Sequence, residues 1–236
     1  MNQGLRSTSF DVPAGQLDAE ARSEFLHKTY QHLALAIIAF AGLEAVLLQL
    51  PGIENLIGLM VGSRWSWLIV LGLFMLVSNV ASSWASTAVD STRQYVGLGL
   101  YIIAEAVVFL PMLYMASRVA GPEVIPQAAI ITGVVFGGLT ATVLLTKKDF
   151  SFLGGILRVV GFGALGVIIV SMIFGLSLGT WFAAAMAVFA AGAIVHETSK
   201  ILHVYRPGQH VAASLALFAS VALLFWYILS ILSRRR

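Results

Sequence analysis

The chain has 236 residues, of which 59% are hydrophobic and only 11% are charged, and its mean hydropathy is +0.92. A water-exposed domain carries about a quarter charged residues, because its surface must stay hydrated. The composition therefore excludes a soluble enzyme, a nucleic-acid binder and a disordered chain, and it predicts an all-α, polytopic protein whose surface faces lipid. The net charge of +3 is spread thinly between apolar blocks, which favours a signal for membrane orientation over an acidic partner.

The N-terminal segment, residues 1–28, is mixed and polar, and we expect it to form a cytoplasmic tail that ends in a short surface helix. Acidic side chains, Asp11, Asp18 and Glu24 among them, precede the first apolar block, and this block is too long for the hydrophobic region of a signal peptide. We therefore expect no cleavage there, and a membrane domain over residues 29–236.

Seven apolar blocks follow, each of about the 20 residues that span a bilayer. They cover residues 30–50, 67–84, 95–115, 124–145, 152–176, 181–201 and 211–232. This pattern predicts seven transmembrane helices. A further apolar segment, residues 53–61, is too short to span, and we expect it to lie in the membrane interface beside the anchoring side chains of Trp65 and Trp67.

The positions of lysine and arginine predict the orientation. With seven spans, one side of the membrane receives eight of these cations: Arg6, Arg22, Lys28, Arg93, Lys147, Lys148, Lys200 and Arg206. The other side receives Arg64, Arg118 and the three arginines of the C-terminus. The loops thus place the N-terminus in the cytoplasm, whereas the arginine tail argues the other way. The alternative is that the last block forms a re-entrant hairpin and six helices cross.

Small residues at four-residue spacing mark two possible helix contacts. Gly133, Gly137 and Ala141 lie on one face of the fourth span, and Ala187 and Ala191 lie on one face of the sixth. Such spacing lets a neighbouring helix approach closely. We expect both faces to pack against other spans.

Few ionisable residues lie inside the spans, and these positions are informative because a charge in lipid is costly unless it is neutralised, paired or hydrated. Glu44 lies in the middle of the first span and Glu105 in the middle of the third. Arg158 lies in the fifth span, and His196 and Glu197 lie near one end of the sixth.

Glu197 is the strongest candidate for a functional group. It precedes Lys200 by one turn and His203 by about two, so we expect the three titratable groups to share roughly one helix face. Burial and a nearby cation act on a carboxyl in opposite directions, and such a group can be poised to titrate as a proton or cation gate requires. The alternative is a static ion pair that joins two helices, with Arg158 as the partner.

The sequence lacks the complete motifs of two enzyme classes. His196 and Glu197 begin a zinc-binding H-E-x-x-H motif, but the second histidine would fall at position 200, which is Lys200. No serine has the setting of an intramembrane protease nucleophile. We therefore expect no catalytic residues, no metal site and no cofactor.

Four segments resemble the Bax inhibitor-1 family, also called the transmembrane BAX inhibitor motif proteins. Residues 145–155 (LTKKDFSFLGG) are similar to the family signature, and residues 192–203 (GAIVHETSKILH) resemble its sixth-helix motif. Residues 25–30 (FLHKTY) resemble the basic segment before the first helix, and residues 105–111 (EAVVFLP) resemble the acidic third helix that ends in proline. Together the resemblance covers nearly the whole chain from residue 25.

The resemblance implies a seven-helix fold in which one helix is enclosed by the other six. Members are described as pH-sensitive calcium leak channels, gated by one aspartate in the sixth helix and one in the seventh, near an arginine. The first aspartate corresponds to Glu197. The second would fall near Phe218, and the seventh block contains no acidic residue. The acid pattern resembles the bacterial branch whose members bind the membrane protease FtsH and slow its attack on other membrane proteins.

Two hypotheses follow, both for a protein of the bacterial cytoplasmic (inner) membrane. The first is a cation leak, for calcium ions or protons, in which Glu197 titrates and the other candidates are Arg158, Glu105 and His196, with Glu44, Lys200 and His203 as secondary groups. The second is a non-channel protein that binds and modulates FtsH. The partners expected are therefore the lipid bilayer with either these ions or the protease, and no nucleic acid.

Overall fold

The computed structural model describes residues 13–87 and 91–234, and every regular element in these two ranges is helical. The elements are η1 (Ala14–Gln16), α1 (Ala19–Leu47), α2 (Ile53–Val61), α3 (Arg64–Ala85), α4 (Ser91–Met115), η2 (Ala116–Ala120), α5 (Val124–Thr146), α6 (Leu153–Phe174), α7 (Thr180–His203) and α8 (His210–Ser233). In the described ranges seven helices are long and apolar enough to cross a membrane. This confirms the all-α polytopic class, and α2 is the predicted short helix.

Local chemistry fixes several of the helix ends. Asp18 caps α1 by accepting a hydrogen bond from the backbone N–H of Ala21 at 2.8 Å, and Ser63 caps α3 in the same way from Ser66 at 3.0 Å. Lys147, with a φ of 53°, ends α5 in the left-handed conformation that few residues other than glycine adopt. The capped start of α1 at Ala19 lies well before the first apolar block.

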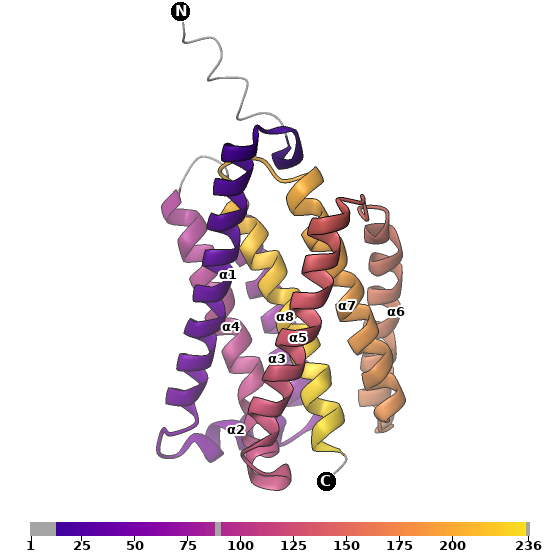
Figure 1. Ribbon diagram of the computed structural model, residues 1–236. Coiled ribbons are helices and arrows are strands. Elements are labelled where there is room, and N and C mark those ends of the chain that lie inside the picture. Colours follow the sequence, from indigo (N-terminus) through magenta and orange to yellow (C-terminus); the bar gives the residue numbers. More distant parts are fainter. Residues whose placement is uncertain (1–12, 88–90, 235–236) are drawn as a thin grey trace, which may run out of the picture.

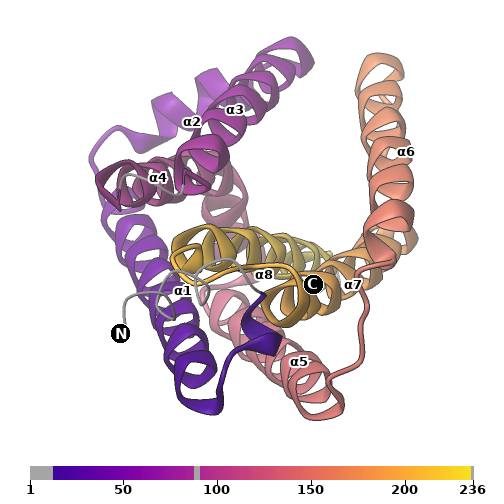
Figure 2. The ribbon, with the colours of Figure 1, turned by 90° about the horizontal axis from the view of Figure 1, so that it is seen from above.

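Helix α8 occupies the centre of the bundle, as the view along the helices shows (Figure 2). It packs against α1, α3, α4, α5 and α7, whereas α6 stands outside this ring and packs mainly on α7. Since α8 is one continuous helix of 24 residues, the alternative of a re-entrant hairpin is wrong. Figure 1 shows that the end of α8 and the start of α1 lie at opposite ends of the bundle, as seven crossings require.

Aromatic rings join the central helix to its neighbours. Phe109 of α4 is 2% exposed and meets the ring of Phe40 edge-on, with 5.2 Å between centroids, and the ring of Trp226 at 4.9 Å. Phe218 of α8 is equally buried and packs edge-on against the same Phe40 at 5.8 Å. Edge-to-face rings at these distances add to the burial of large side chains in holding α1, α4 and α8 together.

The small-residue stripe of α5 does not make the helix contact that its spacing predicts. A side-chain carbon added at Gly133 or Gly137 would meet no atom within 4 Å among the described residues, so no neighbouring helix comes close. The prediction is wrong because this face of α5 borders an apolar crevice between α5 and α1. On α7, in contrast, Ala187 packs against the core.

Candidate functional site

A polar cavity of about 770 Å³ lies between α3, α4, α7 and α8. We call it the Glu197 cavity. Its polar lining comes from ten residues: Ser78, Asn79, Ser82, Ser83, Ser86, Tyr101, Glu197, Tyr205, Gln209 and Ser220. A hollow of this size with so many hydroxyl and amide groups suits water, and it provides a hydrated surrounding for the Glu197 carboxylate.

Glu197 is paired within its own helix. Lys200 donates from Nζ to Glu197 Oε2 at 2.9 Å and to Oε1 at 3.1 Å, and the two side chains are 16% and 25% exposed. The same ammonium lies 5.2 Å from the centroid of the Tyr205 ring, a cation–π distance. Burial raises the pKa of the Tyr205 hydroxyl above its usual value of 10.0, and the negative charge of Glu197 raises it further.

The alternative pair between Glu197 and Arg158 is wrong. Arg158 of α6 is exposed and makes no ion pair or hydrogen bond with any described residue. The partner is instead the cation three residues along α7, where side chains on the same helix face meet. Glu197 and Lys200 therefore form a local pair and do not join two helices.

His203 does not share the face of Glu197 and Lys200, contrary to the prediction. Six residues turn a helix by about 240° beyond a full circle, so the side chains at 197 and 203 point in different directions. His203 Nδ1 lies 2.9 Å from the carbonyl oxygen of Ser199. His196 also turns away from the pair, and its Nδ1 lies 3.4 Å from the carbonyl oxygen of Phe150.

The loop between α5 and α6 is fastened to α7 by the residues of the family signature. The backbone N–H of Phe150 donates to the hydroxyl of Ser199 at 2.8 Å, and the N–H of Ser151 donates to Asp149 at 2.8 Å. The adjacent hydroxyl and the N–H of Ser151 hold the pKa of Asp149 below its usual 3.8, and electrostatic attraction to His203 lowers it further. These signature residues therefore have a structural role.

Glu105 lines a second cavity, of about 460 Å³, which extends between α3, α4, α6, α7 and α8 toward the opposite end of the bundle. We call it the Glu105 cavity. Phe74 of α3 lines both cavities, and its ring lies 6.1 Å from that of Tyr101, which lines the Glu197 cavity. Tyr101 and Glu105 are one turn apart on α4. The two aromatic rings therefore lie where the two cavities approach each other.

Glu44 lies in neither cavity. It lines a crevice of about 370 Å³ between α1 and α5, whose floor is formed by α8 and whose other lining residues are almost all apolar. The residue is 4% exposed, and neither carboxylate oxygen has a hydrogen-bond partner among the described residues. Glu44 is therefore an acid without a partner in an apolar crevice, whereas Glu197 is paired and lines a different cavity.

Phe218 fills the position at which the resemblance implies a second gate acid. Its ring is 2% exposed and packs edge-on against Tyr101 at 6.1 Å, in addition to Phe40. The only acidic side chain that lines the Glu197 cavity is thus Glu197 itself, as far as the described residues go. Nor do these residues hold a group of three or more histidine and acidic side chains suited to a metal ion.

Sequence reasoning missed the lining of the Glu197 cavity. Ser78 and Ser82 of α3 and Ser86, the residue that caps its C-terminus, recur at four-residue spacing, and Tyr205 follows α7. The serine spacing was a usable signal, because residues four apart share a helix face. Hydroxyls in a span are common, however, and only the packing of α3 against α8 shows that this face borders a cavity.

Seven long apolar helices, of which α1, α3, α4, α5 and α7 pack around the central α8, with acidic side chains in cavities between them, define a polytopic α-helical membrane protein. Comparison with known families narrows the class. The model of the family described as "Inhibitor of apoptosis-promoting Bax1" matches residues 22–236. The chain therefore belongs to the Bax inhibitor-1 family.

Relatives in this family come from bacteria and eukaryotes. An uncharacterized protein of Pseudomonas aeruginosa is 32% identical over 96% of this chain and 96% of its own length. The modulator of FtsH protease YccA of Escherichia coli is 32% identical over 85% of this chain and 84% of its own. Bax inhibitor 1 of Schizosaccharomyces pombe is 28% identical over 94% of this chain and 80% of its own.

Proposed function

We propose that this protein is a non-enzymatic modulator of the membrane protease FtsH in the bacterial inner membrane. The observation that carries the proposal is the similarity to the Escherichia coli modulator, which extends over most of both chains. The same relative in a second strain is named an inner membrane protein. In this proposal the chain binds the protease and slows its attack on other membrane proteins.

The geometry around Glu197 supports a binding role over a two-carboxylate gate. Lys200 already balances the charge of Glu197, and Phe218 stands where the second acid would be required. Coupled titration needs two interacting groups, and this site supplies one. A modulator requires only a stable fold and an accessible binding segment, for which we propose the N-terminal tail.

Association with the protease tests the proposal directly. The full-length chain, extracted in mild detergent, is expected to co-purify with FtsH and to slow degradation of a membrane substrate. Deleting residues 2–12 leaves η1 and the Asp18 cap of α1 in place, so the variant should insert normally and lose the association. A full-length protein that neither co-purifies with FtsH nor slows degradation contradicts the proposal.

We also propose that the N-terminus faces the cytoplasm, as the lysines and arginines predict. The chain contains no cysteine, so single cysteines can be introduced without background. A cysteine at Ser91, at the end of the bundle where α1 starts, should resist a membrane-impermeant thiol reagent in intact cells. A cysteine at Ser177, between α6 and α7 at the opposite end, should be labelled. The reverse pattern would invert the topology.

A second candidate function, a cation leak, is favoured by one specific observation: two cavities that extend toward opposite ends of the bundle share Phe74 in their lining. In this proposal calcium ions or protons pass the Phe74 and Tyr101 rings between Glu197 and Glu105, and Glu197 is the titrating group. One group predicts a shallow, single transition with pH.

Flux into reconstituted vesicles tests the leak. Phe74→Ala removes one of the two rings and should increase calcium or proton flux, and Glu197→Gln should change flux without a change of pH. Phe162, which is 70% exposed on α6 and lines neither cavity, provides the matched control as Phe162→Ala. Flux equal to that of empty vesicles between about pH 5 and pH 8, for the wild type and for Phe74→Ala, rejects the leak.

A further inference from the structure

A small pocket with a cationic rim lies at the end of the bundle where α1 begins and where α5 and α7 end. Its volume is about 270 Å³. Three basic side chains line it, Arg22 of α1, Lys147 after α5 and His203 of α7, together with the apolar side chains of Leu26, Leu144 and Leu202. We call it the Arg22 pocket. The described residues that line it include no carboxylate.

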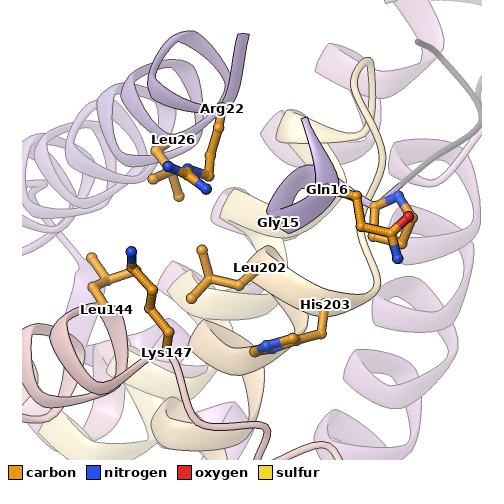
Figure 3. Close-up of a pocket in the computed structure, with 9 residues that line it drawn as sticks. Gly15, Gln16, Arg22, Leu26, Leu144, Lys147, Leu202 and His203 are labelled. Carbon is orange, nitrogen blue, oxygen red and sulfur yellow. The ribbon is translucent and has the colours of Figure 1, made fainter. Parts of the chain in front are cut away.

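Two of the cations face each other without a partner. Figure 3 shows the Arg22 and Lys147 side chains reaching into the same space from opposite walls, with Leu202 beside them. Neither side chain makes a hydrogen bond or an ion pair with a described residue, whereas Lys28 of the same α1 is bonded to Glu24. Two like charges that converge without a counter-charge repel each other, and a bound anion relieves the repulsion.

The backbone positions of these two cations also favour the binding of an anion. Arg22 lies in the first turn of α1, the end of a helix at which the dipole disfavours a cation and favours an anion. Lys147 is held at a φ of 53°, and it is the only described residue other than glycine with a positive φ. Backbone strain of this kind is found disproportionately at binding sites.

The apolar side chains that line the pocket indicate what kind of anion it accepts. Leu26, Leu144 and Leu202 line the pocket beside the cations, and Leu145, the residue after Leu144, is 82% exposed. A ligand with a phosphate and an adjoining hydrocarbon chain matches both parts. Basic pockets between transmembrane helices bind anionic lipid head groups on the same principle.

Helix η1 closes one side of the pocket and keeps it compact. The backbone N–H of Ala14 donates to the carbonyl oxygen of Tyr205 at 3.0 Å, and a side chain at Gly15 would come within 2.6 Å of the carbonyl oxygen of Leu202. The pocket is therefore formed by four separate segments that packing holds in place. We propose that the Arg22 pocket is a binding site for the phosphate head group of an anionic phospholipid.

The first test uses the unmodified full-length protein. Purified protein in detergent receives phosphatidylglycerol, phosphatidylcholine or inorganic phosphate, and lipid binding is followed by native mass spectrometry and by the melting temperature. Phosphatidylglycerol should stay bound and raise the melting temperature, and phosphatidylcholine should do neither. Equal binding of the two lipids overturns the proposal. An equal rise of the melting temperature with inorganic phosphate alone assigns the pocket to a free anion and overturns the proposal of a lipid site.

The second test removes the charges one at a time. Arg22→Gln and Lys147→Asn should each weaken phosphatidylglycerol binding about fivefold, and the double variant about 25-fold, since one cation near an anionic lipid contributes about that factor. Asparagine tolerates the left-handed conformation, so Lys147→Asn preserves the turn. The matched control is Lys148→Gln, which removes the neighbouring exposed cation that does not line the pocket.

The outcomes separate a specific site from general electrostatics. Unchanged binding by Lys148→Gln, together with loss in the double variant and an unaltered melting temperature in phosphatidylcholine, supports the pocket. An equal loss in Lys148→Gln shows that the surface attracts anionic lipid without a site, and it overturns the proposal. So does a double variant that binds phosphatidylglycerol as tightly as the wild type.

Discussion

The central helix α8 presents two faces that differ in the size of their side chains. Toward α3 it offers Ala212, Ala216 and Ala219, which line the Glu197 cavity. Toward α1 and α5 it offers Phe218 and Phe225, which form the floor of the crevice at Glu44. Small side chains leave a space in which polar groups gather and a charged pair is accommodated. The rings instead line an apolar crevice in which the acid has no hydrogen-bond partner among the described residues.

The two acids should therefore respond differently to substitution. Glu197 has a hydrogen-bonded cation and a polar cavity, so removing its charge breaks an interaction. Glu44 has neither, so removing its carboxyl relieves a cost. Three predictions test this difference between the faces, ordered from the largest expected effect to the smallest, and a fourth concerns Asp149 in the loop between α5 and α6.

Phe218→Ala should destabilise the protein by about 3–5 kcal/mol, the range for deleting a fully buried ring. The ring is 2% exposed and contacts Phe40 and Tyr101, so its loss leaves a cavity at the centre of the bundle. Unfolding in mixed micelles provides the measurement. Phe162→Ala, which removes a lipid-facing ring, should cost far less. Similar losses in both variants would show that α8 is not tightly packed on this face.

Glu197→Gln should cost about 1–3 kcal/mol, because it leaves the half-buried Lys200 ammonium without its counter-charge. A double-mutant cycle with Lys200→Gln isolates the pair. The exposed pair of Glu24 and Lys28 is the control, with side chains 65% and 49% exposed and an expected coupling below about 1 kcal/mol. Equal coupling energies in the two pairs would show that the Glu197 cavity does not strengthen the ion pair within it.

Glu44→Met should leave stability unchanged or raise it by about 1 kcal/mol, since it replaces an unpartnered carboxyl by an apolar side chain of similar length. Glu44→Gln is the matched control, because it keeps two polar atoms in the crevice and should bring no gain. A clear loss of stability in Glu44→Met would mean that the carboxyl has an interaction which its surroundings do not account for.

Asp149→Asn should have the smallest effect, and one that depends on pH. The pKa of Asp149 in the folded protein lies below 3.8, so the carboxylate stabilises the fold above pH 3.8, and this contribution disappears as the pH falls through the lowered pKa. Melting temperatures of the variant and the wild type should differ slightly at neutral pH and converge in acid. A difference that stays constant with pH would contradict this assignment.

Hydrophobic pattern alone predicted the fold well, because each span is a local property of the chain. The seven blocks and the short helix over residues 53–61 all correspond to helices in the structure. The stripe at Gly133 failed because spacing cannot tell a helix contact from a lipid-facing crevice. The sequence indicated which residues are apolar or small, and not which neighbour they meet.

The candidate site was less predictable, because its geometry depends on contacts between helices. The sequence singled out Glu197 and Lys200, and the structure pairs them. It also placed His203 on their face and Arg158 within reach, and both expectations failed. Rotation about a helix axis and the depth at which two helices pack decide such contacts. The serines of α3 became significant only once α8 was seen to present alanines to them.

The peripheral position of α6 has a consequence for the path of the chain. Helices α5 and α7 pack side by side and run in the same direction, so the end of one lies a full membrane thickness from the start of the other (Figure 1). Helix α6, about 33 Å long, is the return crossing that joins them. Its removal would reverse the direction in which α7 and α8 cross the membrane. The least buried of the seven spans thus determines toward which side of the membrane Glu197 lies.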